Sequence, residues 1–490
     1  MPLLRPSSAC AHAIQAGGPS TGPVGRAECV AESPVTVAAA AVVDPPERVY
    51  RPRHPERTPI YRTLDSHFDE YTQVHEERFE ERHGTLRPVV QKSVAQYLDC
   101  GRLTGGFARI RCPKCAEEHL LAFSCRTRNL CPSCQSKRSF LFGQHLRDEV
   151  VTDVNHRHVV FTIPKVLRGL FERERRLLGL LARTAYETLR RVLREASGER
   201  DVVPGVVASI QTFGSYANFH PHVHAIVTEG VFQRDGTFVR ADWPPDGVLE
   251  EAFRRILLAA LVRAERLSEE AHASLLSWKH SGFSVFGGQR VLASDPDGLE
   301  RLARYVTRVA MPTNAVTLRE DGKAVLATPP DPHTGACQVV LDPIELVHAL
   351  VTQIPDAGKH LVRYSGAYSH RFRGRVRELE AAKAASVAAQ TAKDAEGKVA
   401  EGEGASPPPV EPVTPAQPGS AEAKRRSSWA RVLKKVFAVD PRLCPKCRVP
   451  MSVVAWITDP VVIGRILEHR RKAGLESPFD ARGPPAPPAS

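Results

Sequence analysis

The sequence predicts an α+β protein, with helices packed on a mostly antiparallel sheet and a smaller helical, cysteine-rich segment before it. From residue 158 to residue 354, short apolar runs typical of strands alternate with amphipathic patterns typical of helices. Turn-forming residues between some strands favour hairpins and therefore antiparallel pairing. Six of the eleven cysteines fall between Cys100 and Cys134, and such clustering is typical of metal binding rather than of disulfides.

The N-terminal part divides into three stretches. Residues 1–55 are rich in Ala, Pro, Gly and Ser without periodicity, which indicates a disordered segment. Residues 61–98 carry aromatic and apolar side chains at three- and four-residue steps, as at Phe68 and Tyr71, which predicts helices. The cysteine-rich stretch follows, and we take residues 60–150 as one small domain.

Two cysteine pairs in this domain have the spacing of a zinc site. Cys112-Pro-Lys-Cys115 and Cys131-Pro-Ser-Cys134 are separated by fifteen residues, as in tetrahedral structural zinc sites. Four thiolates on zinc can replace a core that is too small to fold alone. Buried or free thiols are the alternative. Further candidate ligands, which could replace one of the four or complete a second site, are Cys100, His119 and Cys125.

The same domain is basic around its second cysteine pair. Residues 100–150 carry nine Lys and Arg against four Asp and Glu. A zinc-ordered loop with basic side chains offers a surface for DNA phosphates, although a zinc ribbon also needs such residues for solubility. The candidate DNA-binding residues here are Arg126, Arg128, Lys137 and Arg138.

The α+β domain, taken as residues 155–380, begins with alternating strands and helices. The predicted strands are His158–Ile163, Val206–Phe213, Asn218–Glu229 and Phe283–Leu292. The predicted helices run from Val166 to about Ala196, over Leu249–Leu267 and from Leu299 to about Ala310. We expect the third strand to pair across a turn at residues 233–236. The sheet is expected to be completed by short strands near residues 315–318, 323–327 and 337–341, followed by a helix over residues 343–354.

The third of these strands carries the most informative pattern. His220, His222 and His224 recur at every second position. Because side chains alternate between the two faces of a strand, His222 and His224 point the same way, about 7 Å apart, and can close on one divalent cation. His220 has the same parity, but Pro221 bends the start of the strand or confines it to an edge. The alternative is a strand that carries solvated histidines.

A second pattern lies in the predicted helix that begins at Leu299. Its apolar residues form one face, and Tyr305 lies off that face. The basic neighbours of Tyr305, at three- and four-residue spacing, are Arg301, Arg304 and Arg308. A tyrosine among guanidinium groups lies where a phosphate would bind. An amphipathic tyrosine at the edge of a core is the alternative.

Tyr364 and Tyr368 form a rival tyrosine pair. Gly366 between them and Gly374 after them argue against a rigid helical platform. We therefore prefer Tyr305 as the candidate nucleophile. Tyr364 and Tyr368, set among arginines, are expected to stack on DNA bases.

The C-terminal part is predicted to hold one small ordered unit. Residues 381–427 lack aromatic side chains and are rich in Pro, Ala, Glu and Gly, which indicates a disordered linker, helical in its first part at most. Residues 428–472 form a small basic unit, and residues 473–490 are a Pro-rich tail. Cys444-Pro-Lys-Cys447 has the spacing of half a zinc site, and a reduced thiol pair is the alternative.

The composition bounds the partners of the chain. Its 490 residues hold 67 Lys and Arg against 55 Asp and Glu, a formal net charge of +12, which favours a polyanionic partner and nucleic acid first. No apolar run approaches the roughly 18 residues of a membrane span. The N-terminus lacks the pattern of a secretory signal. We therefore expect an intracellular protein without a membrane partner.

Three stretches, in this order, resemble the rolling-circle insertion-sequence transposases of the IS-ninety-one-like group, members of the HUH single-strand endonuclease superfamily. They are Cys112–Cys134, Gln211–His224 and Gly282–Arg308. The resemblance covers about residues 60–380, and residues 429–470 also look like a C-terminal extension of that group. It implies an HUH endonuclease core of the ferredoxin or RRM-like type and a bacterial, cytoplasmic, nucleoid-associated protein.

The same resemblance implies roles for single residues. His222 and His224 would hold Mg²⁺ or Mn²⁺ on the scissile phosphate, with Gln211 or His220 as a third ligand. Tyr305 matches the nucleophile that forms a 5′-phosphotyrosine bond with single-stranded DNA. Some members carry a second tyrosine four residues earlier, where this chain has Arg301, so it looks like a single-tyrosine enzyme. Either a second protomer or reuse of Tyr305 would then complete strand transfer.

Other functions remain open at this point. A zinc-ribbon DNA-binding protein without catalysis would use the histidine strand only as structure. A replication-initiating or mobilising HUH nuclease would be expected to carry a helicase or primase segment, and the sequence has no phosphate-binding Gly-Lys-Ser/Thr loop. A metal-dependent hydrolase that uses water would form no covalent adduct with DNA.

Overall fold

The computed structural model describes residues 55–215, 218–331, 334–396, 443–444 and 446–475. The predicted disordered segment before residue 55, most of the predicted linker and almost all of the predicted tail lie outside the described residues. Among the residues that are described, no helix combines the length and the apolar character needed to cross a bilayer.

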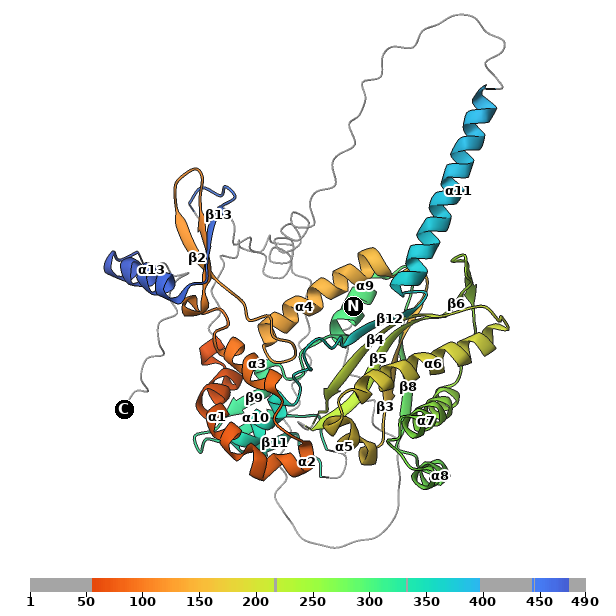
Figure 1. Ribbon diagram of the computed structural model, residues 1–490, viewed down its shortest axis with the longest axis horizontal. Helices are drawn as coiled ribbons and strands as arrows, with labels where there is room; N and C mark the ends of the chain where they lie inside the picture. Colours follow the sequence, from red (N-terminus) through yellow and green to blue (C-terminus); the bar gives the residue numbers. More distant parts are fainter. Residues whose placement is uncertain (1–54, 216–217, 332–333, 397–442, 445, 476–490) are drawn as a thin grey trace, which may run out of the picture. The chain divides into compact units, whose positions relative to one another are not determined.

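A five-stranded antiparallel sheet forms the centre of the α+β domain (Figure 1). Its strand order is β12-β4-β5-β3-β8. The strands are β3 (His156–Thr162), β4 (Gly205–Phe213), β5 (Phe219–Thr228), β8 (Ser284–Val291) and β12 (Val362–Gly366). Every pair of neighbouring strands is antiparallel. The α+β class with an antiparallel sheet is therefore confirmed.

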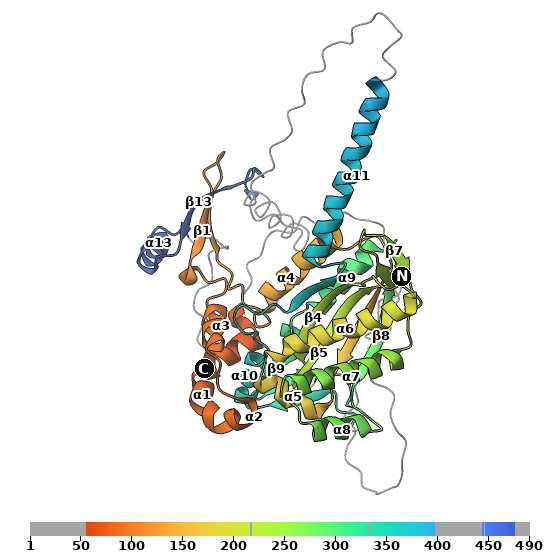
Figure 2. The same cartoon turned by 45° about the vertical axis from the view of Figure 1, so that its right-hand side comes forward.

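One face of the sheet is covered by long amphipathic helices, which lie across the strands in Figure 2. These helices are α5 (Lys165–Arg173), α6 (Leu177–Ser197) and α7 (Asp246–Arg263), and α8 (Glu269–Ser277) follows them. Val223, Ala225 and Val227 of β5 point into this core. Because strand side chains alternate, the residues between them point to the opposite face.

The opposite face is covered by α9 (Pro296–Val306) and by α4 (Pro132–His145) with its continuation η4 (Leu146–Val150). Val207 and Ile226 of the sheet pack there against Leu302 and Val306 of α9. The helices α4 and α9 also lie against each other. This smaller core leaves room on the same face for the polar residues of β3, β4 and β5.

Two predicted elements differ in the structure. The single helix expected from Val166 to Ala196 is two helices, because Glu174 leaves the helical region (φ −116°, ψ 75°). The Glu174 carboxylate accepts a 2.5 Å hydrogen bond from Nε of Arg266, which holds the break in place.

The turn at residues 233–236 does not connect the histidine strand to a partner strand, although this was predicted. It joins β6 (Gly230–Phe232) to β7 (Phe238–Arg240), which form a separate two-stranded sheet. The chain leaves the central sheet at Gly230, where a Cβ would lie 2.4 Å from the carbonyl oxygen of Val239. The histidine strand β5 is instead central, between β3 and β4.

The short strands expected to complete the sheet form a sheet of their own. These are β9 (Val316–Leu318), β10 (Ala324–Ala327) and β11 (Gln338–Leu341). Their apolar side chains pack into one core with the N-terminal helices, because Val316 and Leu326 meet apolar residues such as Ile60 and Val94. The helices of this core are α1 (Pro59–His75), α3 (Pro88–Leu98) and α10 (Pro343–Val351), with η2 (Glu76–Glu80) and α2 (Glu81–His83) continuing α1.

The described C-terminal residues join the cysteine-rich segment instead of standing alone. Strand β13 (Ser452–Ile457) pairs antiparallel with β1 (Phe107–Arg111), which pairs in turn with β2 (Glu118–Ala122). Ile463 of α13 (Pro460–Lys472) packs on Phe107 and Leu120. The predicted separate unit is thus completed by a strand pair contributed from the N-terminal half.

Helix α11 (His370–Glu396) extends into the predicted linker. Its sequence is rich in Ala and also carries Arg and Glu, residues with high helix propensity. The side chains from Glu378 to Gln390 are exposed, so this part of the helix gains little from packing.

Candidate active site and metal centres

The histidines of β5 lie on the sheet face that α9 covers. His222 and His224 are both buried, and their Nε2 atoms are 3.1 Å apart. Two nitrogens at about 2.1 Å from one metal ion and at right angles to each other are about 3 Å apart. The pair therefore fits one divalent ion.

Backbone contacts set the orientation of His222. Its Nδ1 donates a 2.7 Å hydrogen bond to the carbonyl oxygen of His220, which leaves the lone pair on Nε2. The His220 ring itself is tilted against that of His222, with ring centres 5.2 Å apart. His220 thus contributes a backbone acceptor, and burial lowers the pKa of its ring to about 3.

A third histidine, which was not among the predicted site residues, lies in the same group. Nε2 of His158, on β3, is 2.8 Å from Nδ1 of His224, and the two rings are stacked. A signal for it exists, because His156-Arg157-His158 repeats the spacing of His222-Val223-His224. Val159 and Phe161 of β3 point into the apolar core, and His156 and His158 alternate with them on the other, polar face.

Burial keeps these imidazoles neutral. It lowers the pKa of His158 and of His222 to about 4, and the pKa of His224 well below the ordinary value. The nearby Arg308 lowers all three further. Neutral imidazoles are the form that binds metal ions.

Gln211 joins this histidine face to α9. It lies directly across from His222 on β4. Its Nε2 donates a 2.8 Å hydrogen bond to the carbonyl oxygen of Val306, the last residue of α9. The amide oxygen is not part of that bond and is of the type that binds Mg²⁺ or Mn²⁺.

Tyr305 lies in the last turn of α9, over the histidines. Its ring is edge-on to those of His158 and His224, with ring centres 5.8 and 5.7 Å away. The Tyr305 side chain is 42% exposed. The strand and the helix that the sequence singled out thus face each other, with the phenol open to solvent.

The three arginines of the predicted stripe do not share one role. The guanidinium carbon of Arg308 lies 4.4 Å from the centre of the Tyr305 ring. That of Arg304 lies 5.3 Å from the ring of Phe140 on α4, and Arg301 pairs with Asp295 at 3.4 Å. The helix ends at Val306, earlier than expected, so Arg308 folds back over the tyrosine.

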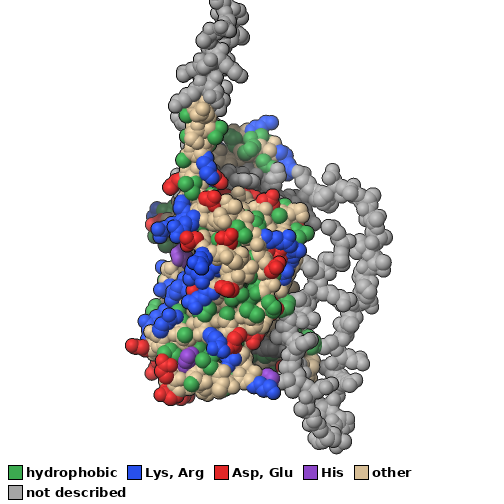
Figure 3. Space-filling view, turned by 90° about the vertical axis from the view of Figure 1, so that its right-hand side faces the viewer, with side chains coloured by type: hydrophobic (Ala, Val, Ile, Leu, Met, Phe, Trp, Pro, Cys, Tyr) green, Lys and Arg blue, Asp and Glu red, His purple; other side chains and the backbone are tan. Residues whose placement is uncertain are grey.

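A cavity of about 270 Å³ separates the cysteine-rich domain from the sheet next to this group. Its lining includes Arg128, Arg138, Gln211, Arg308 and Tyr364. On the face shown in Figure 3, Lys and Arg side chains gather down one side of the molecule.

The remaining predicted DNA-binding residues have mixed environments. Arg126 is exposed, and its carbonyl oxygen accepts a hydrogen bond from Arg138. Arg128 donates to the carbonyl oxygens of Asp356 and Lys359. Burial lowers the pKa of Lys137. Exposed Arg126 and Arg138 are thus the most accessible to a phosphate.

Tyr368 does not suit the role of stacking on bases. It is 1% exposed, and its hydroxyl oxygen is 2.5 Å from Nε2 of His156 in the core. Tyr364 is half-buried on β12 and keeps a place on the cavity wall. The expectation for Tyr368 is therefore wrong, because a buried ring cannot reach DNA.

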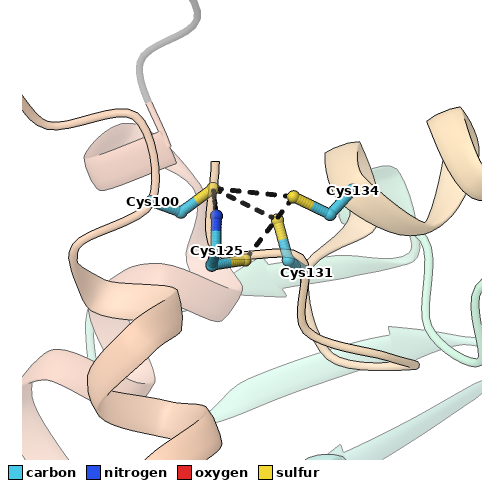
Figure 4. A group of neighbouring side chains, drawn as sticks. All are labelled: Cys100, Cys125, Cys131 and Cys134. Atoms are coloured by element: carbon cyan, nitrogen blue, oxygen red, sulfur yellow. Dashed lines mark hydrogen bonds between the residues drawn. The ribbon is translucent and has the colours of Figure 1, made fainter. Parts of the chain in front are cut away.

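Eight cysteines of the described residues form two clusters, so the single site predicted from Cys112, Cys115, Cys131 and Cys134 is wrong. The first cluster, drawn in Figure 4, contains Cys100, Cys125, Cys131 and Cys134. The second contains Cys112, Cys115, Cys444 and Cys447. His119, on β2, is in neither. The paired strands β1 and β13 bring the distant Cys-x-x-Cys pairs together.

Both clusters fit a zinc ion. Four sulfurs about 2.3 Å from a tetrahedral zinc are about 3.8 Å apart. Sγ of Cys100 is 3.7 Å from that of Cys131 and 3.8 Å from that of Cys134. In the second cluster, Sγ of Cys112 is 3.3 Å from that of Cys447.

The second cluster also shows the backbone contacts of a metal-binding turn. The backbone amides of Cys115 and Lys114 stabilise the thiolate of Cys112 and lower its pKa to about 6. Thiolate is the form that binds zinc.

Helix α4 connects the first cluster to the tyrosine. Cys134 lies in the first turn of this helix. The next residue, Gln135, donates a 2.8 Å hydrogen bond from its Nε2 to the carbonyl oxygen of Thr307. Ser139 donates to the same oxygen at 2.5 Å. The first cysteine cluster thus supports the end of the Tyr305 helix.

Two family models match this arrangement. One described as "Transposase zinc-binding domain" matches residues 71–163, and one described as "Putative transposase" matches residues 205–375. The chain is thus similar to transposases of the IS91 type in both segments. The first match covers the cluster of Cys100, Cys125, Cys131 and Cys134, and the second covers the histidine strand and Tyr305.

Named relatives agree with this assignment. The transposase is 28% identical over 318 residues to "Putative transposase y4qJ" of Sinorhizobium fredii (strain NBRC 101917 / NGR234), across 61% of this chain and 79% of that protein. It is 28% identical over 332 residues to "Transposase for insertion sequence element IS801" of Pseudomonas savastanoi pv. phaseolicola, across 59% and 73%. No solved structure matches the transposase.

Proposed function

We propose that this transposase cuts and rejoins single-stranded DNA at the ends of an insertion sequence, through a covalent bond to Tyr305, in rolling-circle transposition. The observation that carries the proposal is the position of Tyr305: an exposed phenol at the end of a helix, over a buried group of neutral histidines. The similarity to transposases supports DNA as the partner.

Tyr305 acts as the nucleophile in this proposal. Its Oη attacks the scissile phosphorus, a 5′-phosphotyrosine bond forms, and the bond to the 3′ oxygen breaks to give a free 3′-OH. The phenol is exposed, so its proton can leave to solvent. The guanidinium of Arg308, against the ring, lies where it can stabilise the charge of the phosphate. Attack by a 3′-OH on the phosphotyrosine reverses the chemistry and joins the strands.

His222 and His224 would hold the divalent ion, Mg²⁺ or Mn²⁺, through their Nε2 atoms. When bound, such an ion polarises the phosphoryl oxygen. Gln211, through its amide oxygen, and His220 are the two candidates for a third ligand. His158 positions His224 from the outer side.

The DNA strand would follow the basic residues between the two domains. Arg128, Arg138 and Arg308 line one cavity beside Gln211. Arg126, Lys137, Arg301 and Arg304 extend this surface as phosphate contacts. A single strand suits the site, because its backbone can be splayed into the histidine group.

A single nucleophilic tyrosine per chain leaves two ways to complete strand transfer. Arg301 stands four residues before Tyr305, so this turn of α9 offers no second phenol. A homo-oligomer that contributes a second Tyr305, or reuse of the same Tyr305, would serve. The reaction would take place at the bacterial nucleoid, in the cytoplasm.

The test is a Tyr305→Phe variant incubated with labelled single-stranded DNA that carries candidate element ends, with Mg²⁺ or Mn²⁺. We expect the covalent adduct on a denaturing gel to disappear while DNA binding stays within about twofold, since Phe keeps the ring that packs on Arg308. Tyr364→Phe is the matched control and should keep the adduct. Cleavage by Tyr305→Phe at the wild-type rate would reject the proposal.

A further inference from the structure

A third group of metal-binding side chains lies away from both cysteine clusters and from the histidine strand. It consists of His83 at the end of α2, Glu172 in α5 and His348 in α10. Their candidate ligand atoms all lie within 4.8 Å of one another. The residues come from three separate parts of the sequence, so the fold itself assembles the group.

The contact between His83 and Glu172 lacks the geometry of a hydrogen bond. Nδ1 of His83 lies 3.0 Å from Oε1 of Glu172. Yet this buried nitrogen makes no hydrogen bond in the described structure. A separation of about 3 Å is also that of two ligand atoms bound at about 2.1 Å, and at right angles, to one shared ion.

The third side chain, His348, is held in place by its neighbours. Nδ1 of His348 is 3.1 Å from the hydroxyl oxygen of Tyr71. Its ring is stacked on Phe79, with ring centres 4.3 Å apart and planes at 10°. A histidine whose one nitrogen is hydrogen-bonded to an outer partner presents the other nitrogen as a ligand. The ring of His348 lies 4.4 Å from that of His83, and the nitrogen that is not bonded to Tyr71 is its candidate ligand atom.

We propose that His83, Glu172 and His348 bind a Zn²⁺ ion, distinct from the two ions of the cysteine clusters. Two imidazoles and one carboxylate are a common ligand set for zinc, whereas Mg²⁺ and Ca²⁺ prefer ligand sets made only of oxygen. All three residues are partly accessible, so solvent can complete the coordination.

Such an ion would connect three helices that lie far apart in the sequence. Helix α2 ends the continuous helical segment formed by α1, η2 and α2. Helix α5 covers the central sheet beside β5, and α10 follows the sheet of β9, β10 and β11. Because the unfolded chain holds these residues far apart, binding would favour the folded arrangement of α2, α5 and α10. The role is therefore structural, and it does not depend on the proposed cleavage chemistry.

The experiment measures zinc binding by calorimetry in the full chain with both cysteine clusters loaded. His222→Ala and His224→Ala are present in the background, so that the proposed catalytic ligands do not bind zinc. We expect one further zinc per chain, and a rise in the melting temperature when it binds. Glu172→Gln, which keeps the side-chain volume, and His83→Asn should each weaken this binding at least about tenfold.

A matched control is His67→Ala, which removes the imidazole of another His–Glu pair, on α1. It should leave the further zinc in place. Unchanged zinc content of the cysteine clusters and an unchanged circular dichroism spectrum show that the variants are folded. Two results would overturn the proposal and leave a simple His–Glu ion pair. One is that the background protein binds no further zinc, and the other is that Glu172→Gln and His83→Asn bind zinc as tightly as the background protein does. Neither outcome affects the Tyr305 adduct assay.

Discussion

Nε2 of His158 lies 2.8 Å from Nδ1 of His224, so a histidine from the neighbouring strand contacts the outer nitrogen of the predicted metal-binding pair. His224 can present only Nε2 to an ion at the position where His222 also presents Nε2. His158 therefore fixes the ring of His224 without being a ligand of that ion itself. Substitutions of His158 can therefore test whether it only positions the ring of His224 or also coordinates the ion.

We expect His158→Ala to weaken the metal dependence of DNA cleavage. Loss of an outer partner of a histidine ligand costs about ten- to hundredfold in metal affinity. The Mn²⁺ concentration that gives half-maximal adduct formation should rise by that factor, while the rate at saturating Mn²⁺ changes much less. His158→Gln, which can still hydrogen-bond to His224, should restore part of the affinity. An unchanged Mn²⁺ dependence in His158→Ala would rule out the positioning role.

Gln211 has two candidate roles, which two substitutions separate. Gln211→Glu loses the hydrogen bond to the Val306 carbonyl but keeps a side-chain oxygen, whereas Gln211→Ala loses both. If the oxygen is the third metal ligand, Glu should keep the wild-type Mn²⁺ affinity and Ala should lower it about tenfold or more. Equal Mn²⁺ affinity in the two variants would leave Gln211 only the task of holding the end of α9.

The two cysteine clusters should differ in their effect on cleavage. Cys134→Ser and Cys444→Ser should each remove one zinc of the two that the cysteine clusters hold, measured by atomic absorption. Helix α4 carries Cys134 and contacts Thr307 beside the tyrosine, so Cys134→Ser should also slow adduct formation at least about tenfold. Cys444→Ser should release β13 from β1 and leave the adduct rate near that of the wild type. Equal losses of rate would show that the second cluster also supports the active site.

Short-range patterns in the sequence correctly predicted the features that depend only on the geometry of a single strand or helix. Alternation along one strand placed His222 and His224 on one face, and helical spacing placed Tyr305 off the apolar face of α9. Strand order is not a local property, so the pattern along β5 alone does not place His158 beside His224. The spacing of His156 and His158 is the same as in the recognised pair, and this repeat is the signal that could have found it.

The cysteine grouping shows the same limit more clearly. Cys112 and Cys447 are 335 positions apart, and only the pairing of β1 with β13 brings them together. Two close Cys-x-x-Cys pairs in the sequence therefore suggested a shared ion, although each pair belongs to a different one. The predicted place of the strands after residue 315 in the central sheet was wrong for a related reason. Their apolar faces pack against the N-terminal helices, and no short-range pattern indicates this long-range contact.

Buried His156 should make the fold sensitive to acid. Burial lowers the pKa of His156 to about 4, and its Nε2 is 2.5 Å from the hydroxyl of Tyr368. In the unfolded chain the pKa of histidine is about 6.5. The unfolded chain therefore binds more protons between these two values, so the free energy of unfolding falls as the pH drops from about 6.5 toward 4 and is unaffected by this group at higher pH.

Replacement of His156 by Gln should remove this part of the pH dependence, since Gln does not titrate. The wild type should lose about 2 kcal/mol more than His156→Gln between about pH 7 and pH 5, as measured by urea unfolding at both pH values. The difference between the two proteins is the relevant quantity, because acid also protonates the zinc-binding thiolates in both. His156→Gln should be less stable at pH 7, where it loses packing on Tyr368. Parallel pH profiles for the two proteins would mean that His156 does not titrate as a buried neutral group.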